Sequence, residues 1–562
     1  MASHFIIECM DCGHKTPFIA SASDCPNCHS TWREAMYDYN RLSKSLLLQI
    51  SGRSFDLWRY KDLLPVRTME PAYSLGEGGT PLLRASNLGG MLGCPNIFIK
   101  DERQGPTGSF KDRQAAVTIA ALKEAGINEL VVASTGNVAI AYSAYAARAG
   151  IRLWAFLTSL VPAEKMREVA LYGTQVIKVT GSYDEAKQVA GEFARQRGIF
   201  YDLGARTISC VESMKTVSFE VVEQLTALLG PPPNPDKNKP GLTFFSPDWY
   251  VQSVSGGLGP VGVHKGFHEF KKMGFIDHIP KMAIIQAEGC APMVHAWKQN
   301  QEVAIPVQNP KTVIATLATG DPGRTYTVLR QKMISTSGGA FESVLDEEAF
   351  RAMHYLAKME GISVEPAAAV AFAGMIKLIR AGVIKSDEVI VINCSGHTMP
   401  IEQKIIGEGW SRDVKPSAKE LESGSEEGLL SALTQESIQG FPRIAIVDDE
   451  PDARRLIRRI LQSQGNYTIF EATNGKEAVE VINREIPNLV ILDLMMPEMD
   501  GFSVMDALRK KPETAEIPII VLTAKELTQN EKIRLQGHIQ KLMQKGDFLT
   551  DDLLDEVKTL LR

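Results

Sequence analysis

The sequence ELVVASTGNVAIAYSAYAARAG, residues 129–150, decides the fold class. Its first part is a short apolar run typical of a buried strand, and its alanine-rich second part is typical of a helix. Between residues 76 and 410, further strand-like runs alternate with helical stretches, namely IFIK, LWAFLT, VIKVT, KMAIIQAEG and VIVINCSG. Because neighbouring parallel strands are joined by crossover helices, this alternation predicts an α/β fold with parallel sheets.

Length and charge limit the class of protein. The 562 residues exceed what one hydrophobic core organises, so we expect several domains. The formal net charge of -6 gives no basic surface for nucleic acid, and no uncharged apolar run reaches the roughly 18 residues of a membrane helix. The first ten residues also lack the pattern of a secretion signal. We therefore expect a cytoplasmic protein, with neither nucleic acid nor a membrane as partner.

Two CxxC pairs stand at the beginning of the sequence, Cys9 with Cys12 and Cys25 with Cys28. Four thiolates at this spacing suit tetrahedral zinc, and four protein ligands leave no open position for chemistry. The alternative is a set of buried or redox-active thiols. Because so short and polar a segment needs a staple to fold, we expect a structural zinc ribbon.

The segment GPTGSFKDR (105–113) places Lys111 at an expected helix start after a glycine-containing turn. A lysine beside helix N-termini can have a lowered pKa and act as a nucleophile. STGN (134–137) opens a helix whose amides can bind a carboxylate, and the glycines of SGGLGP (255–260) allow close approach to a phosphate. Cys394-Ser395-Gly396-His397 follows the strand VIVIN, at the sheet edge where open α/β folds hold ligands.

Over about residues 5–410, these motifs resemble those of fold-type II pyridoxal-phosphate enzymes, and among them the threonine synthases. Further shared motifs are EGGTPL (77–82), AYAARAG (144–150), VEPAAAV (364–370) and SGH (395–397). The cysteine pairs also look like the ribbon of many threonine synthases. The resemblance implies a two-domain catalytic unit that carries pyridoxal 5'-phosphate (PLP). It also implies a lyase that converts O-phospho-L-homoserine and water into L-threonine and phosphate.

The same resemblance implies a role for each motif residue. Lys111 is the catalytic residue, which forms the Schiff base and moves protons at the substrate α-carbon. Asn137 contacts the ring hydroxyl of the cofactor, and Ser395 meets its pyridine nitrogen. The cofactor phosphate is held by Ser255, Gly256, Gly257, Leu258 and Gly259. The substrate carboxylate is bound by Ser134, Thr135, Gly136 and Asn137.

The chain departs from the threonine synthases where the family binds the substrate phosphate. Val138 stands in place of a hydroxyl residue after the STGN asparagine, and Cys210 stands in place of an arginine. Gln114 also replaces a glycine after the KDR motif, whereas Arg206 or lysines could supply the missing charge. Two alternatives therefore stay open. One is a β-eliminase or β-replacement enzyme acting on serine, threonine or a related amino acid. The other is an amino-acid sensor that signals through its C-terminal region.

After Pro442, five strand–helix units fit a small doubly wound domain, of the flavodoxin-like type. Acidic residues follow its first and third strands, and three carboxylates at one sheet edge require a cation such as Mg²⁺. The region resembles the receiver domain of response regulators, with Asp493 as phosphoacceptor. By that resemblance, Asp448, Asp449 and Asp493, with the Met495 carbonyl, hold Mg²⁺, and Thr523 and Lys545 respond to the phosphoryl group. Leu542 and Gly546 depart from the usual aromatic and proline positions.

We therefore expect five segments along the chain. They are a zinc ribbon (1–32), a lead-in (33–75), the PLP-dependent catalytic unit (76–410), a linker (411–441) and the receiver (442–562). The expected partners are a small amino-acid substrate and a sensor histidine kinase or phosphotransfer protein. Family resemblance further suggests a homodimer, and the fusion suggests that the receiver regulates the enzyme.

Overall fold

A computed structural model describes most of the chain, as residues 5–22, 24–67, 70–158, 161–232, 243–397, 441–464, 467–523, 527–535, 537–544 and 550–561. It divides into two compact units. The first comprises Met1–Ser86, Cys94–Met353 and Ser363–Pro400, and the second comprises Asn87–Gly93, His354–Ile362 and the described part of Ile401–Arg562. The expected linker lies outside the described residues apart from Phe441, and the boundaries of the five expected segments stay predictions.

The N-terminal ribbon is a three-stranded antiparallel sheet. Its order is β2-β1-β3, formed by β2 (Lys15–Thr16), β1 (Phe5–Cys9) and β3 (Arg33–Tyr37). The third strand comes from the segment expected as a lead-in, because Phe5 pairs with Tyr37 and Cys9 with Arg33. The rest of that segment forms α1 (Tyr39–Ser51), which buries Leu42, Leu46 and Ile50 on one face, and the 3-10 helix η1 (Leu57–Leu63).

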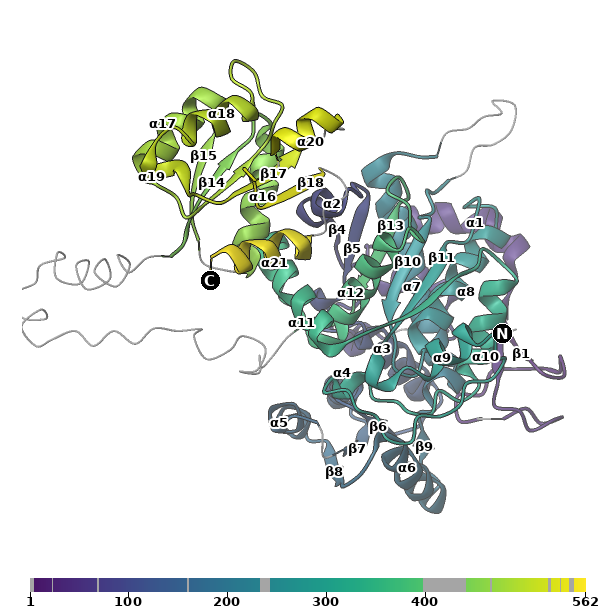
Figure 1. Cartoon of the computed structure of the whole chain (residues 1–562). Helices are drawn as coiled ribbons and strands as arrows, with labels where there is room; N and C mark the ends of the chain where they lie inside the picture. Colours follow the sequence, from purple (N-terminus) through teal and green to yellow (C-terminus); the bar gives the residue numbers. More distant parts are fainter. Residues whose placement is uncertain are drawn as a thin grey trace, which may run out of the picture. The chain divides into compact units, whose positions relative to one another are not determined.

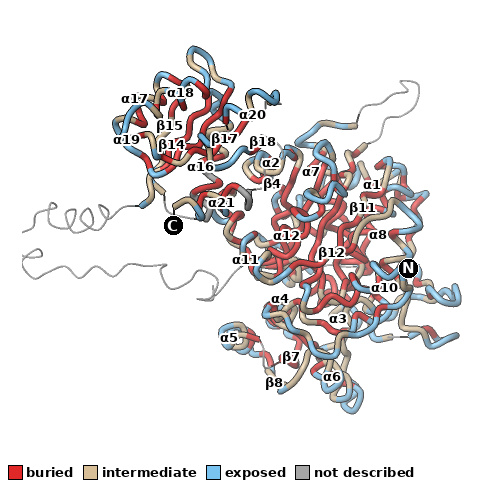
Figure 2. The backbone as a smooth tube through the Cα atoms, viewed as in Figure 1, coloured by how far each residue is buried: buried red, intermediate tan, exposed pale blue. Residues whose placement is uncertain are grey.

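The larger sheet of the first unit has six strands in the order β12-β11-β10-β13-β5-β4 (Figure 1). Only β4 runs antiparallel to its neighbour. The strands are β12 (Gly339–Val344), β11 (Lys281–Ala287), β10 (Trp249–Ser253), β13 (Ile390–Cys394), β5 (Ile97–Asp101) and β4 (Leu82–Arg84). All residues of β10, β13 and β5 are buried, as expected for parallel strands covered on both faces (Figure 2).

The helices that accompany this sheet include the longest of the described part, α7. They are α7 (Ile208–Leu229), α8 (Leu258–Lys272), α9 (Pro292–Lys298), α10 (Thr325–Ile334), α11 (Asp346–Tyr355) and α12 (Pro366–Arg380). Helix α2 (Ser86–Leu92) belongs, apart from Ser86, to the second unit. Short helical turns of the first unit are η2 (Pro71–Tyr73), η3 (Glu102–Gln104), η4 (Gly204–Arg206), η5 (Glu288–Cys290) and η6 (Ala315–Leu317), and η7 (Leu356–Glu360) belongs to the second unit.

The second sheet of this unit is parallel, with the order β8-β7-β6-β9. Its strands are β8 (Gln175–Val179), β7 (Arg152–Thr158), β6 (Glu129–Ser134) and β9 (Phe200–Tyr201), and its helices are α3 (Lys111–Glu124), α4 (Asn137–Ala149), α5 (Ala163–Leu171) and α6 (Tyr183–Arg197). Alternate residues of β6 face opposite ways. Leu130 and Val132 pack in the core with α3 and α4, whereas Val131 and Ala133 pack with α6.

The second unit contains a five-stranded parallel sheet with the order β15-β14-β16-β17-β18. The strands are β14 (Arg443–Val447), β15 (Thr468–Ala472), β16 (Leu489–Leu492), β17 (Ile519–Thr523) and β18 (Lys541–Gln544). The helices are α16 (Pro451–Gln464), α17 (Gly475–Glu485), α18 (Gly501–Leu508), α19 (Pro512–Ala515), α20 (Gln529–Leu535) and α21 (Thr550–Leu560). One core joins the sheet to α17 and α18, and another joins it to α16 and α21. This confirms the doubly wound, flavodoxin-like arrangement.

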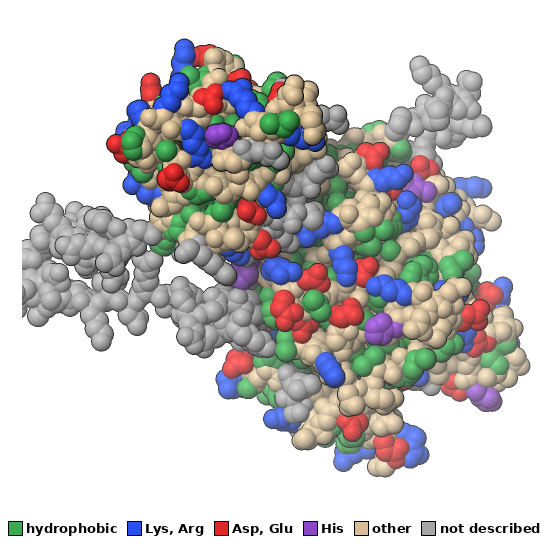
Figure 3. Space-filling model, in the orientation of Figure 1, with side chains coloured by type: hydrophobic (Ala, Val, Ile, Leu, Met, Phe, Trp, Pro, Cys, Tyr) green, Lys and Arg blue, Asp and Glu red, His purple; other side chains and the backbone are tan. Residues whose placement is uncertain are grey.

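The surface carries charges of both signs. On the face shown in Figure 3, lysine and arginine side chains lie among aspartate and glutamate side chains. Within the described part of the chain, no helix is long and apolar enough to span a bilayer.

Candidate functional site

A cavity of about 1340 Å³ lies in the first unit and contains most of the residues expected to bind the cofactor. Those that line it are Lys111, Thr135, Asn137, Ser255, Gly256, Gly257, Leu258, Gly259 and Ser395. They come from the ends of β6, β10 and β13 and from the start of α3. The motifs, which are far apart in sequence, therefore come together at one site, at the carboxyl ends of parallel strands.

Lys111 is held opposite Ser395 by backbone pairing. Lys111 begins α3, and the preceding loop bonds to the segment after β13. The amide of Phe110 donates to the Ser395 carbonyl at 3.1 Å, and the amide of His397 donates to the Gly108 carbonyl at 3.0 Å. Gly108 has a φ of +74°, which favours glycine at this turn. These contacts fix the two residues at one end of the cavity.

The environment of Lys111 shifts its titration toward the neutral form. Its Nζ lies 4.3 Å from the centroid of the Phe110 ring, a contact that by itself favours the charged form. Burial lowers the pKa of Lys111 to about 8, against the opposing effect of nearby Asp202 and Glu365. A neutral amine near neutral pH is what a nucleophilic lysine needs.

The glycine loop is shaped to receive an anion. It connects β10 to α8, so the amides of residues 256–259 stand at a helix N-terminus. Gly257 has a φ of +85°, and a Cβ there would lie 2.9 Å from the Thr325 side chain. A Cβ at Gly256 would meet nothing within 4 Å, so the loop is open there. Ser255 and Thr319 share a short hydrogen bond between their hydroxyls. The loop therefore fits the phosphate of the expected cofactor.

The STGN segment turns sharply between β6 and α4. Gly136 has a φ of +139°. The Ser134 hydroxyl is buried and accepts from the amides of Gly136 (3.0 Å) and Ala139 (3.1 Å), so it stabilises the start of α4. Thr135 and Asn137 line the cavity, whereas Ser134 and Gly136 are not among its lining residues. The expected contact of this segment with a substrate carboxylate stays a prediction.

Two residues to which the sequence analysis assigned no role, Glu365 and Lys165, form hydrogen bonds with the side chain of Asn137. Its amide nitrogen donates to Glu365 Oε1 at 2.7 Å, and its amide oxygen accepts from Lys165 Nζ at 2.9 Å. Glu365 belongs to the VEPAAAV motif and its amide donates to the Gly396 carbonyl at 3.2 Å. The VEPAAAV motif could have pointed to Glu365 from the sequence alone. Its partner Asn137, however, is 228 residues away in sequence.

A buried carboxylate, Asp202, follows β9 on another wall of the cavity. Its Oδ2 accepts from Gln114 Nε2 at 2.9 Å, and its Oδ1 accepts from the Cys210 thiol at 3.2 Å. Burial first, and then Asp202, raises the pKa of Cys210 well above its usual value, so the thiol stays protonated. Gln114 and Cys210, two of the residues that depart from the threonine synthase pattern, thus act together on Asp202.

The last residue of the KDR motif has an architectural role. Arg113 is buried and donates to Glu102 and Glu220, with distances of 2.6 to 2.8 Å. Lys100 also donates to Glu220, at 2.6 Å. Because each buried charge has an opposite partner, the network holds β5, α3 and α7 together behind Lys111.

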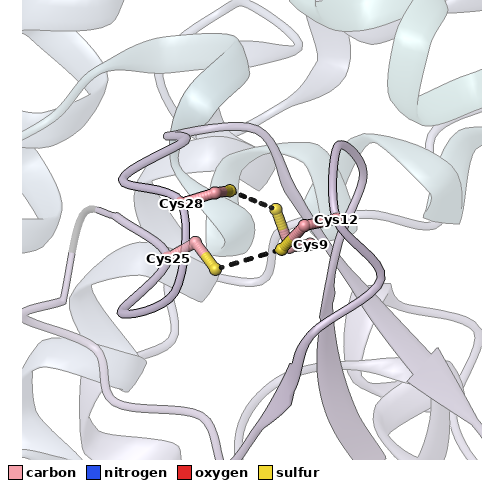
Figure 4. Close-up of side chains that lie close together, drawn as sticks. All are labelled: Cys9, Cys12, Cys25 and Cys28. Atoms are coloured by element: carbon pink, nitrogen blue, oxygen red, sulfur yellow. Dashed lines mark hydrogen bonds between the residues drawn. The ribbon is translucent and has the colours of Figure 1, made fainter.

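The four N-terminal cysteines converge on one point. Their sulfur atoms lie within 4.8 Å of one another. Figure 4 shows the four side chains pointing toward one another. Cys9 and Cys28 are 3.5 Å apart and Cys12 and Cys25 are 3.7 Å apart, measured between sulfurs. Four thiolates this close would repel one another without a cation, so the cluster fits a tetrahedral zinc ion.

The second unit brings together three carboxylates at one edge of its sheet. Oxygens of Asp448, Asp449 and Asp493 lie within 4.8 Å of one another, and Asp448 and Asp493 are buried. The amide of Met495 donates to Asp493 Oδ1 at 3.2 Å. Thr523 ends the neighbouring strand β17 and is buried. Lys545 and Gly546 lie outside the described residues.

Comparisons with known proteins agree with this division. A family model described as "Pyridoxal-phosphate dependent enzyme" matches residues 73–396, and one described as "Response regulator receiver domain" matches residues 444–558. Threonine synthase of Methanocaldococcus jannaschii is 35% identical over 366 residues, which are 65% of this chain and 85% of the relative. Threonine synthase of Methanosarcina acetivorans is 34% identical over 401 residues, which are 71% and 93%. The solved diaminopropionate ammonia lyase from Escherichia coli covers 66% of this chain and 92% of its own, with a TM-score of 0.50 and 15% identity. This last likeness concerns the fold alone.

Proposed function

The chain belongs to the pyridoxal-phosphate dependent enzymes, is threonine synthase-like and carries a response regulator receiver domain, and on this premise we propose that it converts O-phospho-L-homoserine and water into L-threonine and phosphate. The observation that supports the proposal best is the position of Lys111. It lies in one cavity with the glycine loop, the STGN segment and Ser395, as a PLP-dependent lyase requires.

The protein's own residues would bind and orient the reactants. PLP, when bound, supplies the electron sink for a carbanion at the substrate α-carbon. The amides of residues 256–259 would hold its phosphate, and Ser395 would accept or donate at its ring nitrogen. Lys111, about half of which is neutral at pH 8, would take a proton from the α-carbon and return one later in the reaction.

The substrate phosphate needs a cation, and Arg206 is our candidate. Cys210 is buried and engaged with Asp202, and Val138 has no hydroxyl, so neither can bind a phosphate. Arg206 ends η4 and lines the cavity. Among the described residues it forms no ion pair, whereas Lys187 on the same wall pairs with Asp184 at 2.5 Å. An arginine can bind a phosphate through two parallel hydrogen bonds.

A second candidate function is β-elimination from an unphosphorylated hydroxy amino acid. The observation that favours it is Asp202, a carboxylate on the cavity wall among the groups that act on Lys111. A carboxylate repels a phosphate dianion but accepts a hydrogen bond from a hydroxyl. This candidate predicts ammonia release from L-serine or L-threonine.

The experiment is an absorbance titration of the PLP-loaded protein with O-phospho-L-homoserine, L-serine and L-threonine, with released phosphate and ammonia measured. We expect phosphohomoserine to shift the cofactor band and to release phosphate. Arg206→Gln should raise KM for phosphohomoserine by about tenfold or more, equivalent to about 1.4 kcal/mol. Arg195→Gln, at an exposed arginine paired with Glu192, is the control and should change nothing. A shift with L-serine alone would move the assignment to β-elimination.

We also propose the two metals. Zinc would be held by Cys9, Cys12, Cys25 and Cys28, in a closed and therefore structural site. Magnesium would be held by Asp448, Asp449, Asp493 and the Met495 carbonyl, since hard oxygen ligands suit this ion.

For the receiver, we propose that Asp493 accepts a phosphoryl group from a sensor histidine kinase or a phosphotransfer protein. The phosphoryl group adds nearly two negative charges beside Thr523 and, by resemblance, Lys545. We propose that this changes the activity or the assembly of the catalytic unit, for which family resemblance suggests a homodimer. Turnover and oligomer size, measured with and without acetyl phosphate, should differ for the natural chain and not for Asp493→Asn. Equal values for both proteins would refute the regulation.

A further inference from the structure

The N-terminal ribbon reaches the active-site cavity. Trp32, four residues after Cys28, lines the same cavity as Lys111. Arg324, the residue before α10, lines it as well. The Arg324 guanidinium carbon lies 5.7 Å from the centroid of the Trp32 ring. The catalytic cavity therefore has one wall made partly by the segment that carries the cysteine cluster.

An ion pair joins the ribbon to this wall. Asp11 stands between Cys9 and Cys12 and faces Arg324 with both carboxylate oxygens. One guanidinium nitrogen donates at 2.7 Å, and the other makes a still shorter contact. A two-point pair of this kind fixes the plane of the guanidinium group. Arginine has five N–H donors, so Arg324 keeps donors for a second anion.

The local structure around the cysteines holds Asp11 and Trp32 in place. The amide of Met10 donates to the Trp32 carbonyl at 3.0 Å, and the amide of Cys25 donates to the Ser30 carbonyl at 2.8 Å. The amide of Trp32 in turn donates to the Ser30 hydroxyl at 3.1 Å. Because these bonds link both cysteine loops, the fold of the cluster sets the position of both side chains.

The ribbon is also fixed to the catalytic fold by buried polar contacts. Tyr37 donates to Glu212 on α7 at 2.9 Å, and Lys265 on α8 donates to the Ala35 carbonyl at 2.6 Å. All of these side chains are buried. A ribbon held in this way cannot swing away from the cavity without exposing unpaired buried charges, which is costly.

We propose that the cysteine ribbon is part of the substrate site, in which Asp11 and Trp32 are positioning residues that hold Arg324 to bind an oxyanion of the amino-acid substrate. The inference rests on the proposed function, because it takes an amino acid to enter this cavity. The oxyanion is the phosphate or the carboxylate of the substrate, and both present the same chemistry to a guanidinium group.

The test compares variants of the PLP-loaded full chain. Asp11→Asn removes the charge that holds Arg324, and Arg324→Gln removes the proposed ligand. Glu8→Gln is the matched control, because Glu8 also directly precedes a cysteine of the cluster but pairs with Lys15 at 3.6 Å. For each variant, the dissociation constant is measured from the shift of the cofactor band, together with kcat, KM and bound zinc.

We expect Asp11→Asn and Arg324→Gln to weaken substrate binding about tenfold or more, which corresponds to about 1.4 kcal/mol. The zinc content, the cofactor band without substrate and kcat should stay close to those of the natural chain, and Glu8→Gln should change nothing. Arg324→Lys should recover part of the affinity. Weakening with phosphohomoserine alone would identify the phosphate as the bound group, and weakening also with L-serine or L-threonine would identify the carboxylate.

Unchanged binding in both variants would overturn the inference, as would an equal loss in Glu8→Gln. If Asp11→Asn loses zinc, Arg324→Gln decides, since Arg324 lies outside the ribbon. If phosphohomoserine does not shift the band of the natural chain, the proposed reaction fails, and the same variants are compared with L-serine or L-threonine. A cofactor band that responds to none of the three amino acids would overturn both proposals.

Discussion

The lowered pKa of Lys111 makes a quantitative prediction about how the protein takes up its cofactor. The amine must be neutral to attack the aldehyde of PLP. With a pKa of about 8, roughly 25% of the lysine is neutral at about pH 7.5, whereas an ordinary lysine at 10.5 would be about 0.1% neutral. The structure therefore predicts that PLP adds to Lys111 about two orders of magnitude faster than to an unperturbed lysine.

The assay follows the growth of the cofactor band after PLP is mixed with the apo-protein at a series of pH values. The rate should rise with pH, with a midpoint at about pH 8, and level off above about pH 9, where roughly 90% of the amine is neutral. Asp202 stabilises the charged form of Lys111, so Asp202→Asn should shift the midpoint downward, by up to about one pH unit.

Asp184→Asn is the control for this experiment. Asp184 also lines the cavity, but it pairs with Lys187 and is not among the groups that act on Lys111. Its replacement should leave the midpoint in place. A rate that climbs steadily to pH 10 in the natural chain, or a midpoint that rises in Asp202→Asn, would refute the reasoning.

Three further predictions concern the metals and the core. Cys25→Ser should lower bound zinc well below one per chain and lower the melting temperature. The control Cys94→Ser, at a buried cysteine outside the cluster, should keep the zinc. Metal analysis measures the zinc content, and thermal unfolding measures the melting temperature. Glu220→Gln should destabilise the protein by about 3–5 kcal/mol in denaturant unfolding, because Lys100 and Arg113 lose their partner. Although burial raises the pKa of Glu220, these cations lower it to about 2. The contribution of Glu220 to the free energy of unfolding is therefore fully present above the unfolded pKa near 4.5 and is lost as the pH falls from there toward 2. If Glu220→Gln shows the same dependence of stability on pH as the natural chain, this reasoning is wrong. Asp448→Asn should weaken magnesium binding about tenfold or more by calorimetry, and Asp506→Asn, at an exposed acid paired with Arg534, should not.

The sequence was sufficient for the parts of the site that depend on local structure. A strand followed by a glycine turn and a helix places an anion site at the turn, whatever the rest of the chain does. For this reason the STGN segment and the loop from Ser255 to Gly259 could be expected to bind anions, whereas the roles of Lys111, Asn137 and Ser395 came from the resemblance to fold-type II PLP enzymes. The acids after β14 and β16 follow the same rule, because the ends of parallel strands share one edge of the sheet.

The contacts of the site between residues far apart in sequence could not be predicted from local sequence patterns. Gln114 and Asp202 are 88 residues apart, and nothing local marks either as a partner of the other. Arg324 and Asp11 are 313 residues apart, and both look like ordinary surface charges in sequence. The third strand of the ribbon was expected to be a lead-in, because five residues without strict alternation become a strand only through pairing with β1.

The most direct test of the account is to locate the cofactor. The protein is incubated with PLP, treated with borohydride to fix the bond, digested and examined by mass spectrometry. The account predicts one pyridoxyl group per chain, on Lys111, and none in Lys111→Ala. A group on another lysine, or unchanged labelling in the variant, would contradict it.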